Sequence, residues 1–201
     1  MADLEVLSAG VRESLPELSL IGDAELRERV VRAWAIALAE SEFERIDDIP
    51  GAGDWKSPPM KDGSQAHHLR GVATMAVGLA RGMQQVFPAL EVDYDVLIAG
   101  ALLHDVGKAF ELSRRNLTRW RARPARTGLP AIRHPVYGVH VALSAGLPEA
   151  VVHIVGGHSM YGEGSLINPS IEDLIVQHAD HVQWRVLNSA DMLTEKTLAI
   201  K

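Results

Sequence analysis

The residues with the clearest chemical potential are a histidine and an aspartate that close an apolar stretch. They are His104 and Asp105, in the segment GALLHDVGK at residues 100–108. Ionisable side chains seldom end a buried apolar segment without a partner. Imidazole and carboxylate side by side suit divalent ions such as Fe, Mn or Zn, so the pair predicts a metal site. A hydrogen-bonded His-Asp pair at a helix end is the structural alternative.

The composition leaves histidine and carboxylate as the available metal ligands. The chain of 201 residues has nine histidines and no cysteine, which excludes disulfides, thiolate zinc sites and iron–sulfur clusters. With 47% hydrophobic residues it can bury a single substantial core. The net charge of −6 argues against duplex nucleic acid bound through overall phosphate neutralisation, so we do not expect nucleic acid as a partner.

Helices are the elements expected to position these residues. Apolar stripes at helical spacing and N-cap residues predict helices over residues 24–43, 64–86, 93–106, 134–145, 148–155 and 170–193. Strand signals are weak, so the predicted fold class is all-α. Residues 49–65 contain too many Pro and Gly residues for a regular element, and we expect a long loop there that shapes substrate access.

The segment at 100–108 resembles the signature of the HD-domain superfamily, whose members surround a metal with a His, a His-Asp pair and a distant Asp. His68 resembles the first of these ligands, with His67 as the competing register, and Asp180 resembles the last. The resemblance implies an HD-domain helical bundle with a metal site in its core. It also implies one HD-type domain over residues 1–201, with a core at about 64–193 and an N-terminal helical extension at about 1–63.

Two further histidines resemble those of the two-metal branches of the superfamily. His134 opens the segment HPVYG, and His158 ends the segment VVHIVGGH. The resemblance implies one or two divalent metal ions (Fe, Mn, Zn or similar). In a two-metal site, Asp105 is the implied bridging ligand. The implied metal ligands are His68, His104, Asp105, His134, His158 and Asp180. The Gly-Tyr-Pro tripeptide of the cyclic-dinucleotide branch is missing here, which disfavours that substrate.

Other charged residues extend the prediction. Lys108 follows Asp105 by three residues, and in similar proteins this Lys contacts an anionic substrate; favourable charge at a helix end is the alternative. We therefore expect catalytic roles for Asp105 and Lys108. The arginine-rich stretch at 114–133 is expected to be a loop-rich, solvated surface, or alternatively an anion-binding or nucleic-acid-binding edge. Structural roles are expected for His140, His153, His178 and His181.

The predicted function is metal-dependent hydrolysis of a phosphate ester of a small anionic molecule or nucleotide by metal-activated water. A di-iron oxygenase resembling myo-inositol oxygenase or the phosphonate-cleaving oxygenase is the second hypothesis, and a non-catalytic binding or signalling module is the third. The sequence shows neither a secretory signal nor a membrane-length apolar stretch, so we expect a cytoplasmic protein without a membrane partner. Substrate, metal identity and oligomeric state are left open.

Overall fold

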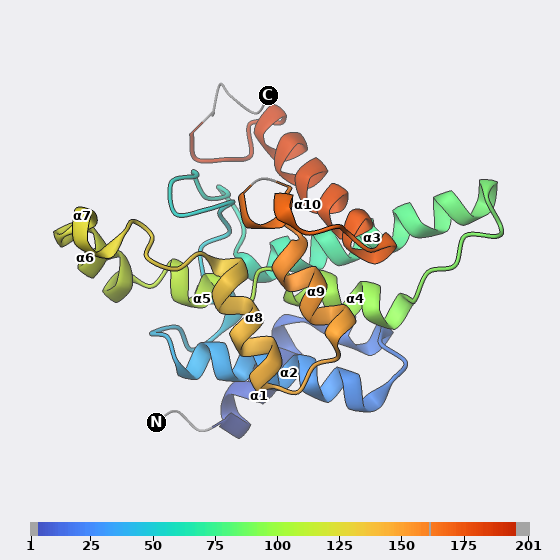
Figure 1. Cartoon of the computed structure of the whole chain (residues 1–201), viewed down its shortest axis with the longest axis horizontal. Coiled ribbons are helices and arrows are strands. Elements are labelled where there is room, and N and C mark those ends of the chain that lie inside the picture. Colours follow the sequence, from blue (N-terminus) through green and yellow to red (C-terminus); the bar gives the residue numbers. More distant parts are fainter. Residues whose placement is uncertain (1–3, 161, 196–201) are drawn as a thin grey trace.

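The computed structural model describes residues 4–160 and 162–195. These residues form helices, loops and two isolated β-bridges, which confirms the all-α prediction (Figure 1). Within the described residues, no helix is both long enough and apolar enough to cross a membrane. In chain order the helices are α1 (Leu4–Ser14), η1 (Pro16–Leu20), α2 (Ala24–Ala39), η2 (Ile46–Asp48), α3 (Gln65–Val86), α4 (Tyr94–Leu103), α5 (Lys108–Glu111), α6 (Arg114–Ala122), α7 (Pro124–Thr127), α8 (His134–Ser144), α9 (Glu149–Gly157), η3 (Gly162–Leu166) and α10 (Ile171–Ser189).

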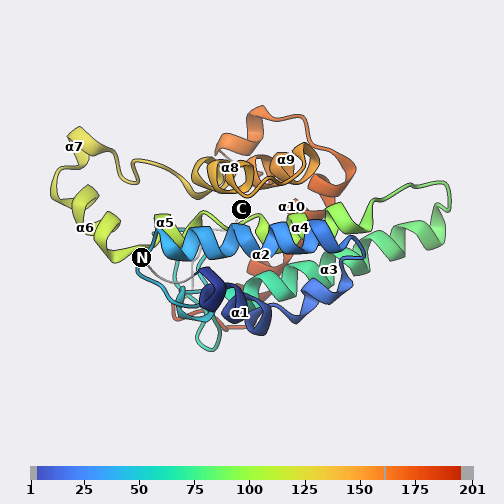
Figure 2. The same ribbon diagram turned by 90° about the horizontal axis from the view of Figure 1, so that it is seen from below.

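Helix α4 lies at the centre of the bundle. The Asp93 carboxylate caps it by accepting the backbone N–H of Val96 at 3.1 Å, and every residue over 97–103 is buried. A helix that is apolar on all sides must be surrounded by other elements. Figure 2 shows α4 between a layer of α8 and α9 and a layer of α1 and α3, and α10 also packs against α4. The apolar stretch before the His-Asp pair is therefore the core of the molecule.

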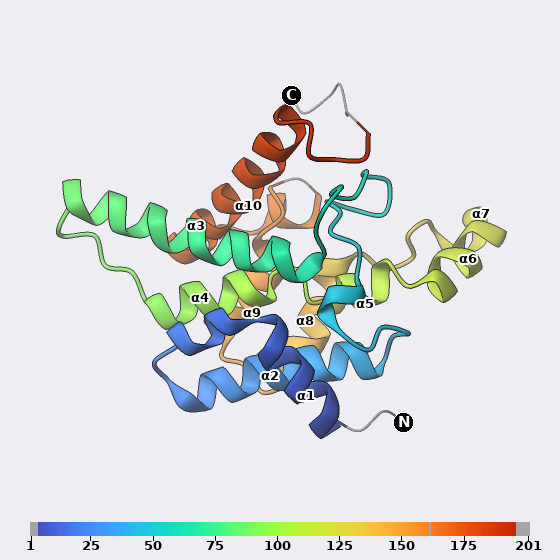
Figure 3. The same cartoon turned by 180° about the vertical axis from the view of Figure 1, so that it is seen from behind.

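The N-terminal helices share this core. The apolar stripe of α2 packs on α4, and the Trp34 indole Nε1 donates a hydrogen bond to the Leu102 carbonyl at 2.8 Å. Trp34 is fully buried, and residues of α1 and α2 belong to the same hydrophobic cluster as α3, α4 and α9. The expected N-terminal extension thus packs directly against the helix that leads to the His-Asp pair (Figure 3).

Three predicted helix ends extend too far. Helix α2 ends at Ala39 and not at residue 43, because the Ser41 hydroxyl bonds the Leu38 carbonyl and accepts the Phe43 N–H, which makes a turn. Helix α4 ends at residue 103 and not at 106, so the His-Asp pair lies in a turn. Helix α10 ends at residue 189 and not at 193, while α9 runs two residues past its predicted end.

The predicted loop at 49–65 is present and is hydrogen-bonded to the segment that follows α10. Apart from its last residue it contains no helix. The Lys61 N–H donates to the Met192 carbonyl at 2.8 Å, and the Thr194 N–H donates to the Pro59 carbonyl at 2.9 Å. These bonds connect segments far apart in the sequence, which explains why a helix was wrongly expected to continue to residue 193.

The arginine-rich stretch is not loop-rich, contrary to the prediction, because it forms α6 and α7. The N-terminus of α6 is capped by the Glu42 carboxylate, which accepts the Arg114 N–H at 2.7 Å and the Ser113 hydroxyl at 3.0 Å. Because this cap comes from a distant residue, the local sequence gives no sign of it. Residues 114–132 form a projection from the bundle, which we call the arginine arm (Figures 1 and 2).

The turn after the His-Asp pair requires glycine at position 107. A Cβ atom on Gly107 would lie 2.0 Å from the His134 carbonyl oxygen and 2.9 Å from the Gly138 nitrogen. We expect Gly107→Ala to lower the free energy of unfolding by about 3 kcal/mol, measured by urea denaturation, because backbone must move. The control Gly82→Ala, with no atom within 4 Å of the added Cβ, should raise stability by up to about 1 kcal/mol. Equal stability of Gly107→Ala and the parent chain would contradict this contact.

Candidate metal centre

Four histidines reach one buried carboxylate, that of Asp105, from four helices. His68 lies on α3, His104 directly follows α4, His134 begins α8 and His158 directly follows α9. All five side chains are buried. Helix ends meet here, so polar groups enter an otherwise apolar bundle at one end. The structure thus brings together five of the six residues predicted as metal ligands.

The two oxygens of Asp105 face different pairs of histidines. Oδ2 lies 3.1 Å from His68 Nε2 and 3.3 Å from His104 Nε2, and these two nitrogens are 3.2 Å apart. Oδ1 lies 3.3 Å from His134 Nε2 and 3.7 Å from His158 Nε2. Each pair forms with Asp105 a set of mutually close donor atoms. We call these the first donor group (His68, His104, Asp105) and the second donor group (Asp105, His134, His158).

The outer nitrogens of three of these rings fix their tautomers. His104 Nδ1 lies 2.8 Å from the Ala101 carbonyl and His158 Nδ1 lies 3.0 Å from the Val155 carbonyl. His134 Nδ1 lies 2.7 Å from a carboxylate oxygen of Glu111. Carbonyl and carboxylate oxygens only accept, so Nδ1 carries the proton and Nε2 of the neutral ring holds a lone pair.

When these three rings are neutral, their Nε2 lone pairs converge on an anionic carboxylate. Unshared electron pairs on facing nitrogens and oxygens repel one another in a dry site, and a cation between them removes that repulsion. The nitrogen and oxygen donors are those that Fe, Mn and Zn accept in proteins. The residues present thus fit one divalent cation in each donor group.

Charges around the Asp105 carboxylate keep it ionised. Burial would raise the pKa of Asp105, but the ammonium of Lys108 and then His104 hold that pKa well below its usual range. Burial would lower the pKa of His104, but the Asp105 charge outweighs it and raises that pKa. Burial lowers the pKa of both His68 and His158. The Asp105 carboxylate is therefore ionised.

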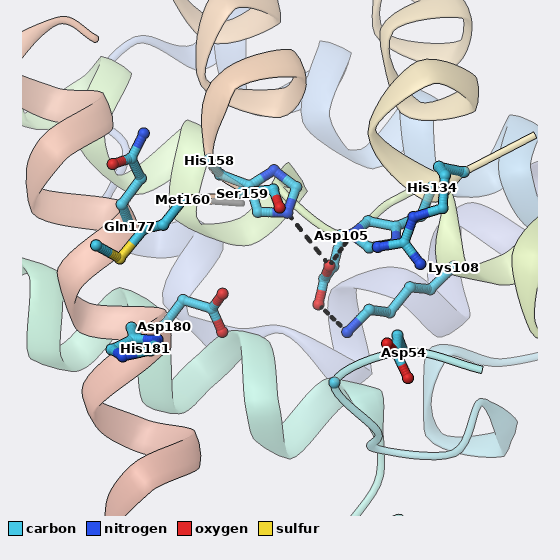
Figure 4. Close-up of a pocket in the computed structure, with 12 residues that line it drawn as sticks. Asp54, Asp105, Lys108, His134, His158, Ser159, Met160, Gln177, Asp180 and His181 are labelled. Atoms are coloured by element: carbon cyan, nitrogen blue, oxygen red, sulfur yellow. Dashed lines mark ion pairs between the residues drawn. The ribbon is translucent and has the colours of Figure 1, made fainter. Parts of the chain in front are cut away.

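Asp180 on α10 approaches the site from one side. Its Oδ1 lies 3.3 Å from His68 Nε2 and has no hydrogen-bond partner among the described residues. The side chain is 21% exposed, and it belongs to neither donor group. Figure 4 shows Asp180 pointing from α10 toward the cavity beside Asp105. The structure places it beside the first donor group, and its role as a ligand stays a prediction.

The structure distinguishes the two neighbouring histidines at the start of α3. His68 points into the cluster, whereas His67 Nδ1 accepts the Ser64 N–H at 3.2 Å and closes the first turn of the helix. One residue rotates a side chain by about 100° around a helix, so only one of the pair can face the site. His68 is the one that does.

Lys108 lies directly against the carboxylate. Its Nζ is 2.7 Å from Asp105 Oδ2 and 2.6 Å from the Ala52 carbonyl, and the side chain is buried. Gln65 was missed by sequence reasoning; its Nε2 donates to the same Asp105 oxygen at 2.9 Å. Ala52 belongs to the long loop and Gln65 begins α3, so the predicted loop covers this side of the site.

Glu111 is a second residue that sequence reasoning missed. This fully buried carboxylate binds Arg133 NH1 through Oε1 at 2.9 Å and His134 Nδ1 through Oε2 at 2.7 Å. Burial would raise the pKa of Glu111, but hydrogen bonds and charge from His134 lower it. The only sequence signal is its position one helical turn after Lys108, which a surface residue shares.

Removing the charge of Glu111 should weaken the second donor group. Outer partners of metal-binding histidines set ring orientation and basicity, and their loss reduces metal affinity about 10- to 100-fold. We expect Glu111→Gln to raise one of the two Mn²⁺ dissociation constants, that of the second donor group, by about that factor, measured by isothermal titration calorimetry. The matched control is Glu91→Gln, which removes an exposed carboxylate between α3 and α4 that belongs to neither donor group. An unaltered dissociation constant in Glu111→Gln would exclude this role.

Asp105, His134 and His158, which form the second donor group, line a cavity of about 230 Å³. Its walls include Gly53 and Asp54 from the long loop, Arg133 before α8, and Gln177 and His181 from α10. Figure 4 shows these elements around Asp105 and Lys108. His181, for which a structural role was expected, lies in the cavity wall, and that expectation stays a prediction. α10 turns out to present two residues of the predicted motif region, Asp180 and His181, to the same space.

The other three histidines lie outside the cluster, as expected. His140 contacts the Tyr137 ring, with ring centres 5.8 Å apart. His153 Nε2 accepts the Ser170 N–H at 3.2 Å, and His178 borders an apolar groove between α3 and α10.

Comparison with known proteins gives one family and two relatives. The sequence matches the HD domain family over residues 66–185, a range that contains every predicted ligand. It is 26% identical over 173 residues to the dihydroneopterin 2′,3′-cyclic phosphate phosphodiesterase of Methanocaldococcus jannaschii, covering 83% of this chain and 66% of that protein. It is 27% identical over 128 residues to the tRNA (cytidine(56)-2′-O)-methyltransferase of Thermoplasma volcanium, covering 58% of this chain and 30% of that protein. The chain therefore spans just under two thirds of the first relative and less than a third of the second. No solved structure matches the sequence.

Proposed function

Because the chain belongs to the HD domain family, we propose that it is a metal-dependent phosphohydrolase that uses water to cleave a phosphate ester of a small anionic molecule or nucleotide. The family match confirms the resemblance drawn from the motif. One observation carries the proposal: two groups of nitrogen and oxygen donors share Asp105, which lines a cavity together with a buried lysine, Lys108. Paired cation sites of this kind are suited to reactions at phosphorus.

The chain's own residues bind and orient the ester. The Lys108 ammonium has three N–H donors, of which two point to Asp105 Oδ2 and the Ala52 carbonyl. The third donates to a non-bridging phosphate oxygen of a substrate in the cavity. Arg133 in the cavity wall adds a second positive charge for the phosphate.

The metal ligands proposed are those predicted from the sequence. His68, His104 and Asp105 hold one cation with Asp180 beside them, while Asp105, His134 and His158 hold the second. Divalent cations bound there supply Lewis acidity and lower the pKa of coordinated water. Glu111 and the backbone carbonyls behind His104 and His158 keep the ring nitrogens directed at these positions. The buried rings and the long loop limit the entry of bulk water.

A cyclic phosphodiester is the substrate class that we propose to test first. The name of the first relative specifies a 2′,3′-cyclic phosphate, and a cyclic ester of a single nucleoside is small and anionic. Addition of water to phosphorus breaks one of the two P–O(ribose) bonds. The released ribose oxygen takes a proton, and a phosphate monoester remains on the other oxygen.

The experiment is hydrolysis of adenosine 2′,3′-cyclic monophosphate, followed by ³¹P NMR with Mn²⁺, Fe²⁺ or Zn²⁺, in air and under argon. We expect conversion to the monophosphate that requires a cation and is equally fast under argon. Conversion that proceeds in air but not under argon would support the oxygenase hypothesis instead. Absence of turnover on cyclic and linear phosphate esters with every cation would support a non-catalytic module.

A further inference from the structure

In the chain, the arginine arm lies between two residues that line the cavity, Lys108 and Arg133. The chain leaves the cavity wall after Lys108, at the start of α5, and returns to it at Arg133, before α8. The ion pair between Arg133 NH1 and Glu111 Oε1, at 2.9 Å, closes the base of the arm. In all three overall views α6 and α7 project from the bundle on this side (Figures 1–3). A ligand that extends from the cavity past Arg133 would therefore reach the base of the arm.

The arm concentrates positive charge in an acidic protein. Residues 112–148 contain seven of the 20 basic residues of the chain and no Asp or Glu. Six of the seven arginines are exposed, and none of these six forms an ion pair with a carboxylate in the described part of the chain. They are Arg114, Arg115, Arg119, Arg121, Arg123 and Arg126. Exposed guanidinium groups without carboxylate partners are suited to phosphate recognition.

Packing holds the arm in place. Trp120 of α6 is 1% exposed, and its ring centre lies 5.8 Å from that of Phe110, which stacks on Tyr137 of α8 at 4.1 Å. With this aromatic face turned inward, the arginines are left on the solvent side. Among the described residues of the arm, Ile132 is the one large apolar side chain that is exposed. The arm therefore lacks the apolar face that membrane-surface helices insert into lipid.

We propose that the arginine arm binds the phosphates of a single-stranded RNA whose 3′ end, closed as a 2′,3′-cyclic phosphate, enters the cavity. This inference rests on the proposed function, because it extends the cyclic ester of one nucleoside to the last nucleotide of a strand. The whole-chain charge gave the opposite expectation about nucleic acid; the distribution of charge over the fold is what favours it. Only a ribose carries the 2′-oxygen that the cyclic ester needs, so the strand is RNA and not DNA.

The reaction on this substrate balances with water alone. Oxygen of water bonds to the terminal phosphorus, one P–O(ribose) bond breaks, and the freed ribose oxygen takes a proton. The product is an RNA with a terminal phosphate monoester and a free neighbouring hydroxyl. The reaction that supplies the substrate is RNA cleavage by attack of a 2′-hydroxyl on the adjacent phosphodiester.

The test compares two substrates and two triple variants. The substrates are an RNA octamer ending in a 2′,3′-cyclic phosphate and adenosine 2′,3′-cyclic monophosphate, assayed at about 0.1 M salt. The arm variant is Arg121→Gln with Arg123→Gln and Arg126→Gln. The control variant, Arg29→Gln with Arg32→Gln and Arg81→Gln, removes the same charge from α2 and α3. Thermal denaturation of each variant verifies folding.

We expect the arm variant to raise KM for the octamer at least about tenfold more than KM for the mononucleotide, and to flatten its salt dependence. The control variant should keep the octamer KM of the parent chain. Hydrolysis of the mononucleotide with equal octamer KM values in the two variants would overturn this inference and leave the proposed function intact. Hydrolysis of neither substrate would overturn both. Arm-dependent binding to phosphatidylserine vesicles without binding to the octamer would assign the arm to membranes and also overturn the inference.

Discussion

Asp105→Asn is expected to lower the rate of phosphate ester hydrolysis by at least about a thousandfold, equivalent to ~4 kcal/mol of transition-state stabilisation. Both donor groups depend on this carboxylate, whose two oxygens face separate histidine pairs. The amide of Asn presents one oxygen and an NH₂ group that cannot accept or coordinate. One donor group must therefore lose its oxygen, so bound cation should fall together with activity, as measured by elemental analysis.

Two further variants make this prediction specific. His104→Ala should also lose bound cation, because it removes a nitrogen of the first donor group. His140→Ala is the control, since this histidine contacts Tyr137 outside the cluster and should retain cation and activity. Circular dichroism verifies that each variant is folded. Equal cation content in all three variants would contradict the assignment of the site.

Lys108→Met is expected to lower kcat by about a hundredfold while bound cation is largely retained. Methionine keeps an unbranched apolar stem of similar length but has no ammonium to donate to a phosphate oxygen. The loss should appear in kcat more than in KM if the ammonium contacts charge that develops in the transition state.

The lysine prediction separates catalysis from a structural role. If Lys108 served only as favourable charge beside a helix, its replacement would change stability and leave kcat unaltered. Lys61→Met is the matched control, because its exposed ammonium pairs with Asp191 away from the cavity. Suppose instead that Lys108→Met loses bound cation and that the molecules still holding cation have a normal kcat. That result would contradict a contact between Lys108 and the substrate.

The parts of the fold that the sequence predicted are those whose signals are local. Asp93 and Ser170 cap α4 and α10 within their own first turns, and the buried run before His104 identifies a central helix from its apolar residues alone. The His-Asp pair, His134 and His158 likewise each lie in a short segment whose neighbouring residues identify it. Such features are readable without knowledge of the tertiary structure.

Features that depend on distant contacts were not predicted. Glu42 begins α6 from another part of the chain, and Glu111 and Gln65 gain their roles only when their helices meet at Asp105 and His134. His181 lies beside Asp180 in sequence, yet its place in the cavity wall depends on how α10 packs. The choice between His67 and His68 needed the helix orientation, which one sequence cannot fix to within a residue.

The central claim is that the histidines around Asp105 hold the cations on which phosphate ester hydrolysis depends. The most direct measurement is a titration of chelator-treated protein with Mn²⁺, in which bound cation per chain and hydrolysis of adenosine 2′,3′-cyclic monophosphate are measured in the same samples. The account predicts two cations per chain, activity that rises with occupancy, and loss of one cation in the double variant His134→Ala with His158→Ala. Full hydrolysis without bound cation, or two cations retained in that double variant, would contradict it.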